Sequence, residues 1–216
     1  MSISGSRPRG IAHQQRGVAL MVALAFLLLL TMLAVSAAGH ASLQERMAGG
    51  LRNAQLAELA AQTALRGAEW RLWKAAQAGQ IRCGVAPIAD CYVYDPARPS
   101  KHVQDFRSKE GWVTKGATEY KGGDGSQDYT MPTGSGLAED ARRTAALARN
   151  PFYLIEDLGP EFAPGAGPPH EGDATSDATT EPRPTGRHIY RITARATGGS
   201  EHVVRVAESI FAARGE

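Results

Sequence analysis

Cysteine is scarce in this sequence, which has only 2 among its 216 residues. That number excludes a disulfide-dense scaffold and any zinc site built from four cysteines. An excess of charge of one sign is also missing, because 24 Lys and Arg residues stand against 22 Asp and Glu residues. A formal net charge of +2 argues against a nucleic-acid-binding domain, which is usually clearly basic. The length suits one domain, or one domain with an appendage.

Charge is absent altogether from the segment VALMVALAFLLLLTMLAVSAA, which occupies positions 18–38 and is called the apolar segment below. An α-helix rises about 1.5 Å per residue, so a helix of this length spans roughly 30 Å, the thickness of a bilayer's hydrocarbon core. The residues before it include Arg7, Arg9 and Arg16 and no acidic residue. The positive-inside rule therefore predicts a cytoplasmic N-terminus and translocation of the rest of the chain.

The apolar segment allows three interpretations. The first is a secretory signal cleaved at a small-residue site such as Val35-Ser36-Ala37. The second is an uncleaved signal anchor, and the third is cleavage after Gly17 that leaves the apolar helix on the mature protein. The segment is longer than the apolar region of a usual secretory signal, which has about 7–15 residues, and the helical pattern continues past Ala38. Both observations favour the second and third interpretations.

Proline is missing between Pro8 and Pro87. Within this interval apolar residues recur at spacings of three, four and seven, as they do on one face of an amphipathic helix. These stripe residues are Leu43, Met47, Leu51, Ala54, Ala61, Leu65, Ala68 and Leu72. We therefore expect one long helix with a transmembrane half, residues 18–40, and an amphipathic half, residues 41–78, whose stripe packs on a folded region.

Motifs in this helix and near the C-terminus resemble those of a known family. Arg16-Gly17, followed by Val18 and the apolar helix, resembles a prepilin-type signal. The segments LQERMAG, LRN and AAQTALR, which begin at Leu43, Leu51 and Ala60, resemble the N-terminal motif of the PilX-type minor pilins of type IV pili. FYLIEDLG from Phe152 and YRITARATGG from Tyr190 are similar to the C-terminal strands of that family. The middle of the chain is not covered by the resemblance.

The resemblance implies a pilin-like α+β fold and one specific processing reaction. A prepilin peptidase would remove residues 1–17 as a leader by cleaving between Gly17 and Val18, and would methylate the new amine of Val18. The chain would be a substrate of that enzyme.

The resemblance also implies a place in an assembly. The helix would pack among neighbouring subunits through residues that include Val18, Val22, Phe26 and Leu30. The implied partners are the prepilin peptidase, the major pilin, other minor pilins, the inner-membrane assembly platform and a PilY-class tip adhesin. The precursor would lie in the inner membrane with its C-terminal domain in the periplasm, and the mature subunit in a pilus at the cell surface.

The fifth residue of the processed chain departs from the family pattern. Most pilins carry Glu there, where its carboxylate pairs with the N-terminal amine of a neighbouring subunit, whereas this chain has Val22. A subunit at the tip has no subunit ahead of it, so a Glu would stay unpaired at a cost of several kcal/mol. Val22 therefore favours a subunit near the tip or one that primes assembly. The alternative is a tolerated substitution without positional meaning.

Residues 79–216 are expected to form a periplasmic globular region. Cys83 and Cys91 are eight residues apart, a separation that can close into a small disulfide loop in an oxidising compartment. Two separate thiols are the alternative. A catalytic Cys would need a nearby His and an electropositive setting, and the sequence shows no sign of either.

The last third of the chain predicts an antiparallel sheet. The strand candidates are Phe152–Glu156, Ile189–Ala196 and His202–Phe211. Gly198 and Gly199 suit a primed hairpin turn between the last two strands. We expect the apolar face of this sheet to cover the stripe of the helix, which gives an α+β arrangement. A proline- and glycine-rich loop is expected at residues 159–186.

Motifs of enzymes and of cofactor sites are missing. The sequence contains no P-loop, no GxSxG motif and no HExxH motif, so we expect neither catalysis nor a cofactor. Asp124, Ser126 and Asp128 form only part of a calcium-loop signature, and an ordinary turn is expected there instead of a metal site. Three tryptophans are expected in the core or between helix and sheet: Trp70, Trp73 and Trp112.

Two further functions fit parts of the sequence. A GspK-class minor pseudopilin of type II secretion also lacks the Glu, but such proteins carry an added helical domain for which 216 residues leave little room. A signal-anchored periplasmic protein of unrelated function, or a secreted enzyme released after Ala37, fits the apolar segment alone. The motifs together favour a PilX-type minor pilin.

Overall fold

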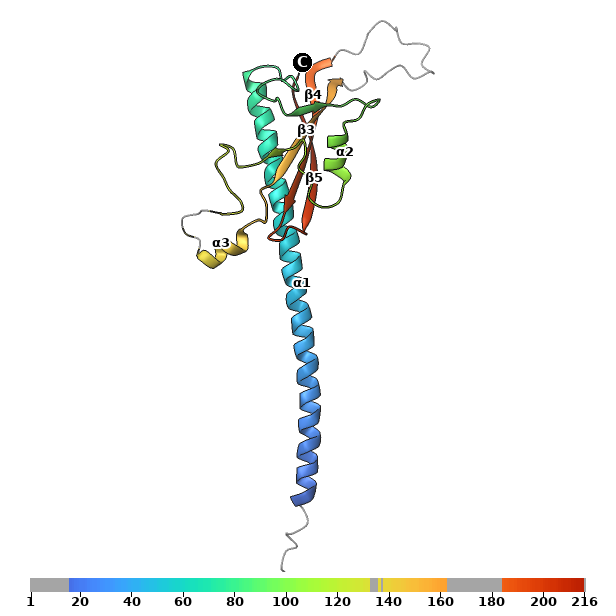
Figure 1. The fold of residues 1–216 in the computed structure, drawn as a ribbon, viewed down its shortest axis with the longest axis vertical. Helices are drawn as coiled ribbons and strands as arrows, with labels where there is room; N and C mark the ends of the chain where they lie inside the picture. The colour runs from blue at the N-terminus through green and yellow to red at the C-terminus, as the bar shows by residue number, and fades with distance from the viewer. Residues whose placement is uncertain (1–15, 133–135, 137, 163–183, 216) are drawn as a thin grey trace, which may run out of the picture. The chain divides into compact units, whose positions relative to one another are not determined.

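The structure is a computed structural model that describes residues 16–132, 136, 138–162 and 184–215. The chain divides into two compact units, Met1–Gly50 and Leu51–Glu216. Helix α1 (Arg16–Ala78) makes up the described part of the first unit and continues into the second. It ends directly before Gly79, a residue type that commonly follows a helix. The prediction of one uninterrupted helix is confirmed (Figure 1).

The second unit adds a five-stranded sheet and two short helices to its part of α1. The strands are β1 (Cys91–Val93), β2 (Thr118–Glu119), β3 (Phe152–Phe162), β4 (Pro184–Thr197) and β5 (Val204–Arg214), and the helices are α2 (Lys101–Ser108) and α3 (Glu139–Ala145). The spatial order is β1-β3-β4-β5, and β2 also pairs with β3. The expected α+β class is therefore confirmed.

The sheet is mixed, where the sequence predicted an antiparallel one. Strands β3, β4 and β5 are antiparallel to one another, but β1 runs parallel to β3. Since β1 follows the helix and reaches β3 without a hairpin, no tight turn imposes antiparallel pairing on it.

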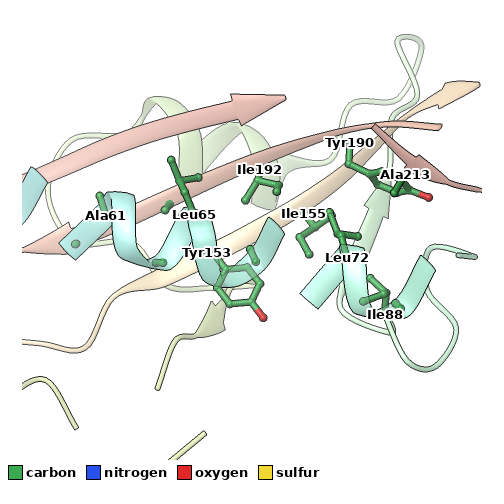
Figure 2. Packing of buried hydrophobic residues seen from close by; sticks show 14 of the residues in the cluster. Ala61, Leu65, Leu72, Ile88, Tyr153, Ile155, Tyr190, Ile192 and Ala213 are labelled. Atoms are coloured by element: carbon green, nitrogen blue, oxygen red, sulfur yellow. The ribbon is translucent and has the colours of Figure 1, made fainter. Parts of the chain in front are cut away.

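Alternating side chains of the sheet point to two different helices. Tyr153, Ile155 and Ile192 belong to the core cluster that includes the α1 side chains, and Figure 2 shows them against Leu65 and Leu72. On the opposite face, Leu154 packs with Val103 and Phe106 of α2. The expected apolar face is confirmed, but the other face is also partly covered, by a helix that the sequence analysis did not predict.

The buried side of α1 in the second unit is built largely from alanine, which lets the helix lie close to the sheet. Its fully or nearly buried residues are Ala57, Ala60, Ala61, Ala64, Leu65, Ala68, Leu72 and Ala75. The predicted stripe is thus correct from Ala61 to Leu72. It is wrong at its beginning, because Leu43, Met47 and Leu51 remain 59%, 73% and 62% exposed.

The connection between β4 and β5 does not contain the predicted primed Gly-Gly turn. Residues 198–203 join the strands, and neither Gly198 nor Gly199 has a positive φ. Instead, the Gly198 N–H donates to Val203 O over 3.0 Å. A Cβ on Gly198 would collide with the side chain and backbone of Asn53, so glycine is required there for close approach of α1.

The predicted loop at residues 159–186 is shorter at both ends than expected. Strand β3 continues to Phe162 and β4 begins at Pro184, so both ends of that range are strand. Residues 163–183 lie outside the described residues, as does most of the predicted leader, 1–15.

Candidate assembly helix and surface of the second unit

The apolar segment of α1 exposes its large side chains. Val18, Val22, Phe26 and Leu30, the residues expected to contact neighbouring subunits, are 65%, 48%, 62% and 64% exposed. Because they are spaced four apart on a helix, they lie along one side of it. The hydroxyl of Thr31, a polar group in this segment, donates to Leu28 O over 2.8 Å. This hydrogen bond within the helix makes the surface of the segment less polar.

Length and composition make this helix able to cross a membrane, and it is the only such helix in the described part of the chain. An apolar surface of this extent requires an apolar environment, either lipid or other helices. The predicted cleavage site lies in the first turn of α1, since the helix begins at Arg16.

Cys83 and Cys91, the pair expected to be bonded, form a disulfide with a Cα–Cα distance of 5.0 Å. The loop that they close contains a short bridge between Val85 and Ile88, and Ile88 is fully buried in the core cluster beside Leu72. The disulfide therefore fixes a loop that contributes a core residue, and its second cysteine begins β1.

Arg71 connects α1 to this loop and to the sheet. Its Nη1 donates to Asp90 Oδ2 over 2.6 Å and to the Tyr153 hydroxyl over 2.8 Å, and its Nη2 donates to Pro87 O over 3.0 Å. Thr118 Oγ1 also donates to Asp90 Oδ2. Burial alone would raise the pKa of Asp90, but the hydrogen bonds from Arg71 and Thr118 outweigh it and lower this pKa. The hydrogen bond with Asp90 in turn raises the pKa of Arg71.

A buried arginine holds α2 on the other face of the sheet. The Arg195 side chain donates to Phe106 O, to Lys109 O and to Gly111 O at the C-terminal end of α2. Phe106 lies in the last turn of α2, and Lys109 and Gly111 follow the helix, so the guanidinium binds carbonyls at and just beyond this end of α2. Burial lowers the pKa of Arg195, which is 1% exposed.

A second link between α2 and the sheet involves Glu208 on β5. Arg107 Nε donates to Glu208 Oε1 over 2.5 Å, and Thr193 Oγ1 donates to the same oxygen over 2.9 Å. The hydrogen bond from Arg107 is the main reason that the pKa of Glu208 is lowered. Both links act on the helix that the sequence analysis missed.

Two of the three tryptophans are not in the core, contrary to expectation. Trp70 and Trp73 are 57% and 45% exposed and stack on each other with ring centroids 4.7 Å apart. Trp112 packs edge-on against Phe152 with centroids 5.7 Å apart, as a helix–sheet or core contact would. The exposed pair lies on α1, on the surface of the second unit.

In the glycine-rich segment, the carboxylates of Asp124 and Asp128 accept hydrogen bonds from backbone N–H groups two residues later. Asp124 Oδ1 accepts from the Ser126 N–H over 3.1 Å, and Asp128 Oδ1 accepts from the Thr130 N–H over 2.9 Å. The Ser126 N–H bond is the main reason that the pKa of Asp124 is lowered, and the pKa of Asp128 is lowered chiefly by the Thr130 hydroxyl, which also donates to its Oδ1, over 2.7 Å. Within the described residues, no group of three His, Cys, Asp or Glu side chains is arranged to hold a metal ion.

Two family models match the chain over most of its length. The model described as "Type IV pilus assembly protein PilX C-term" matches residues 61–213, and the model described as "PilX N-terminal" matches residues 16–66. The chain belongs to the PilX family. The C-terminal PilX match also covers residues 79–150, where the motifs alone showed no resemblance. Neither the curated proteins nor the solved structures provide a match to this PilX-family chain.

Membership of the PilX family makes the chain a type IV pilus assembly protein. The exposed apolar helix suits membrane anchoring, and the stretch that carries it is covered by the PilX N-terminal match. The PilX family is one of pilus structural and assembly proteins, as the motifs predicted.

Proposed function

We propose that this PilX-family subunit primes the assembly of type IV pili and is incorporated near their tip. Before this, a prepilin peptidase cleaves between Gly17 and Val18 and methylates the Val18 amine. The role is one of assembly through helix packing, without catalysis. The observation that carries the proposal is Val22, an apolar residue at the fifth position of the processed chain.

An unpaired charge at position 22 would be costly in a subunit at the tip. In a shaft subunit, a carboxylate at this position is neutralised by the terminal amine of the next subunit. A tip subunit has no such amine ahead of it, and an isolated carboxylate in an apolar core costs several kcal/mol. Val22 removes this cost, and its side chain is 48% exposed on the helix surface, available to pack against a neighbouring helix.

The proposed topology places the N-terminus in the cytoplasm and the second unit in the periplasm. Three arginines before the apolar segment support this orientation, and the Cys83–Cys91 disulfide suits an oxidising compartment. The proposed partners are other minor pilins, the major pilin, the inner-membrane assembly platform, the prepilin peptidase and a PilY-class tip adhesin.

Two measurements test processing and position. Mass spectrometry of the mature N-terminus should find methylated Val18, whereas an intact leader or an N-terminus at Ala38 would contradict cleavage after Gly17. Immunogold labelling of isolated pili should place the subunit at one end. Uniform labelling along the shaft, at the abundance of the major subunit, would overturn the tip position.

A substitution tests the charge argument directly. Val22→Glu introduces a carboxylate without a partner amine, so the number of surface pili should fall, while the control Val22→Leu should leave it unchanged. Electron microscopy counts pili per cell, and membrane fractionation checks that both variants reach the membrane. Equal pilus numbers in the two variants would mean that Val22 has no positional meaning.

A further inference from the structure

Strand β5 forms one edge of the sheet, and most of that edge has no strand partner in the described part of the chain. β5 pairs with β4 along its whole length. The first pair is Val204 with Thr197, and the last pair is Arg214 with Arg187. On its other side, the hydrogen bonds found within the described residues lie at the two ends of the strand: Arg205 Nη1 donates to Val204 O over 3.2 Å, and the Ile81 N–H donates to Arg214 O over 3.0 Å. The edge before Arg214 therefore offers backbone groups for a further strand.

The register shows which groups these are. The Gly198 N–H donates to Val203 O, so this pair is hydrogen-bonded and every second pair along the antiparallel ladder is not. It follows that Val206, Glu208, Ile210 and Ala212 direct their N–H and C=O groups away from β4. Arg214 belongs to the same series, so its carbonyl should also point away from β4. This agrees with the hydrogen bond that it accepts from the Ile81 N–H.

The edge lacks most of the features that usually protect a sheet from pairing with another chain, and between Val206 and Ala212 its one charged residue is Glu208. The opposite side of the sheet ends in β1, which has only three residues, whereas β5 has eleven. No proline and no register shift interrupts β5, and Ile210 in its middle is 61% exposed. Short strands, prolines, bulges and clustered charges are the common means of blocking an edge. A long, regular and partly apolar edge instead indicates an interaction surface.

A cavity lies at the end of β5, on the face that packs on α1. It has a volume of about 540 Å³, and its walls include Trp73 and Gln77 of α1, Arg187 of β4, and Phe211 and Arg214 of β5. The residues that line it include two arginines and no acidic side chain. Arg187 makes one long, exposed contact with Glu161, whose Oε2 is 3.4 Å from its Nε. The cavity therefore suits an apolar side chain accompanied by a carboxylate.

We propose that β5 binds an extended segment of a different pilus protein, which adds to the sheet as a strand beside Val206–Ala212. The backbone pairs with the outward groups of Val206, Glu208, Ile210 and Ala212, as in other cases of strand addition. One apolar side chain of the segment enters the cavity beside Trp73 and Phe211, and an acidic residue contacts Arg187 or Arg214.

A second copy of this chain is a poor occupant for this edge. Antiparallel pairing of two β5 strands is a two-fold contact that closes as a dimer, whereas a filament such as a pilus grows through head-to-tail contacts between subunits. Parallel pairing in register would place Arg205 beside Arg205 and Glu208 beside Glu208. Like charges directly opposite each other on neighbouring strands are destabilising. The segment must therefore come from another protein.

Site-specific cross-linking in cells that assemble pili tests the proposal on the full chain. A photoreactive amino acid replaces Val206 in one variant and Ile210 in another, and mass spectrometry locates the adducts. Because neighbouring strands keep a constant register, the two positions should cross-link to one extended segment of one other protein, at sites four residues apart. Adducts between two copies of this chain, adducts at unrelated sites, or the absence of adducts would overturn the proposal.

Two substitutions in the Ile210 cross-linking variant test the role of the cavity. Trp73→Ala removes a wall of the cavity and should reduce the adduct yield about tenfold, which corresponds to a loss of about 1.4 kcal/mol in binding free energy. Leu59→Ala is the control, since Leu59 is 60% exposed on the same helix, does not line the cavity and should leave the yield unchanged. Equal yields in both would exclude the cavity as part of the site.

Further checks separate this proposal from misfolding and from the tip hypothesis. The Cys83–Cys91 disulfide, measured by thiol labelling, should form in every variant if the second unit is folded. Immunogold labelling gives the position of the subunit independently of cross-linking. A subunit found along the shaft that still yields the expected adducts would contradict the tip position and leave strand addition standing.

Discussion

Two stretches of α1 are both rich in apolar residues but differ in burial. In residues 18–50, the large apolar side chains are exposed, from Val18 at 65% to Met47 at 73%. In residues 57–75, one face is buried against the sheet, with Ala61 and Leu72 at 0% exposure. The second stretch finds its apolar environment within the chain, whereas the first must find it in lipid or in other subunits. Apolar residues in one helix therefore serve folding in one stretch and remain available to lipid or to other helices in the other.

The largest expected effect comes from removing a core side chain of α1. Leu72→Ala should lower the free energy of unfolding of the second unit by about 2–5 kcal/mol, since Leu72 is fully buried and its loss leaves a cavity. Leu27→Ala, at a position that is 62% exposed, should leave this free energy unchanged. Urea unfolding of the full chain in detergent, followed by tryptophan fluorescence, measures both. Equal shifts would mean that the two stretches do not differ as described.

A charge in the apolar segment should have a somewhat smaller effect and act on insertion, not on folding. Phe26→Asp should make membrane insertion about 3 kcal/mol less favourable, because an aspartate near the centre of a membrane helix is costly. Gln55→Asp, at an exposed position of the second stretch, should not change insertion. The ratio of inserted to non-inserted chains in a membrane-insertion assay measures the difference. A similar loss in both variants would remove the distinction between the stretches.

Replacing two glycines of α1 by alanine should change the stability of the protein in opposite directions. A Cβ at Gly67 would collide with the Tyr120 ring, so Gly67→Ala should destabilise the second unit, overpacking costing about 1–3 kcal/mol. A Cβ at Gly49 would have open space, so Gly49→Ala should stabilise the helix by up to about 1 kcal/mol. Circular dichroism during thermal unfolding measures both. A stabilising Gly67→Ala would mean that Tyr120 moves away without cost.

The smallest expected effect is a change in acid sensitivity at Asp90. Its pKa is lowered in the folded chain from an ordinary value of 3.8. The stabilisation from ionised Asp90 is therefore fully present above about pH 5 and is lost as the pH falls towards and through the lowered pKa. Asp90→Asn should lower stability at neutral pH and reduce its decline between about pH 5 and pH 2.

The control for this acid test keeps the carboxylate. Tyr153→Phe removes another contact of Arg71 without removing a titrating carboxylate, so it should lower stability and keep the steep decline. Urea midpoints measured at several pH values compare the two variants. If both variants declined as steeply as the original chain, Asp90 would not be a source of its acid sensitivity.

Local patterns predicted the elements that depend on neighbouring residues. The long helix follows from an interval without proline, and the alternation of Tyr190, Ile192 and Ala194 predicted which face of β4 lies in the core. The apolar segment and the spacing of Cys83 and Cys91 are likewise readable from the sequence alone. Cleavage after Gly17 remains a prediction.

Contacts between distant residues were not predictable in this way. Arg195 alternates with apolar residues, as a solvated side chain would, yet it is buried because α2 lies over it, 89 positions away in the sequence. Gly198 resembled a turn glycine, but the requirement for it comes from Asn53 on α1. A sequence pattern describes one helix or strand at a time. The burial of Arg195 and the requirement for Gly198 depend on contacts between two elements.

Two hydrogen bonds attach the β4–β5 hairpin at its two ends, and this arrangement has a mechanical consequence. Where the hairpin turns, the Ser200 N–H donates to Asn53 Oδ1 over 3.3 Å, and at the end of β5 Arg214 O accepts from Ile81. Asn53 and Ile81 flank the buried stretch of α1. A force applied to the second unit at residue 51 is therefore shared by these two hydrogen bonds and by the packed face of the helix. All of these contacts must break together, instead of one after another. Tension on the subunit would load the hairpin in shear, the arrangement in which its last strand is hardest to peel away.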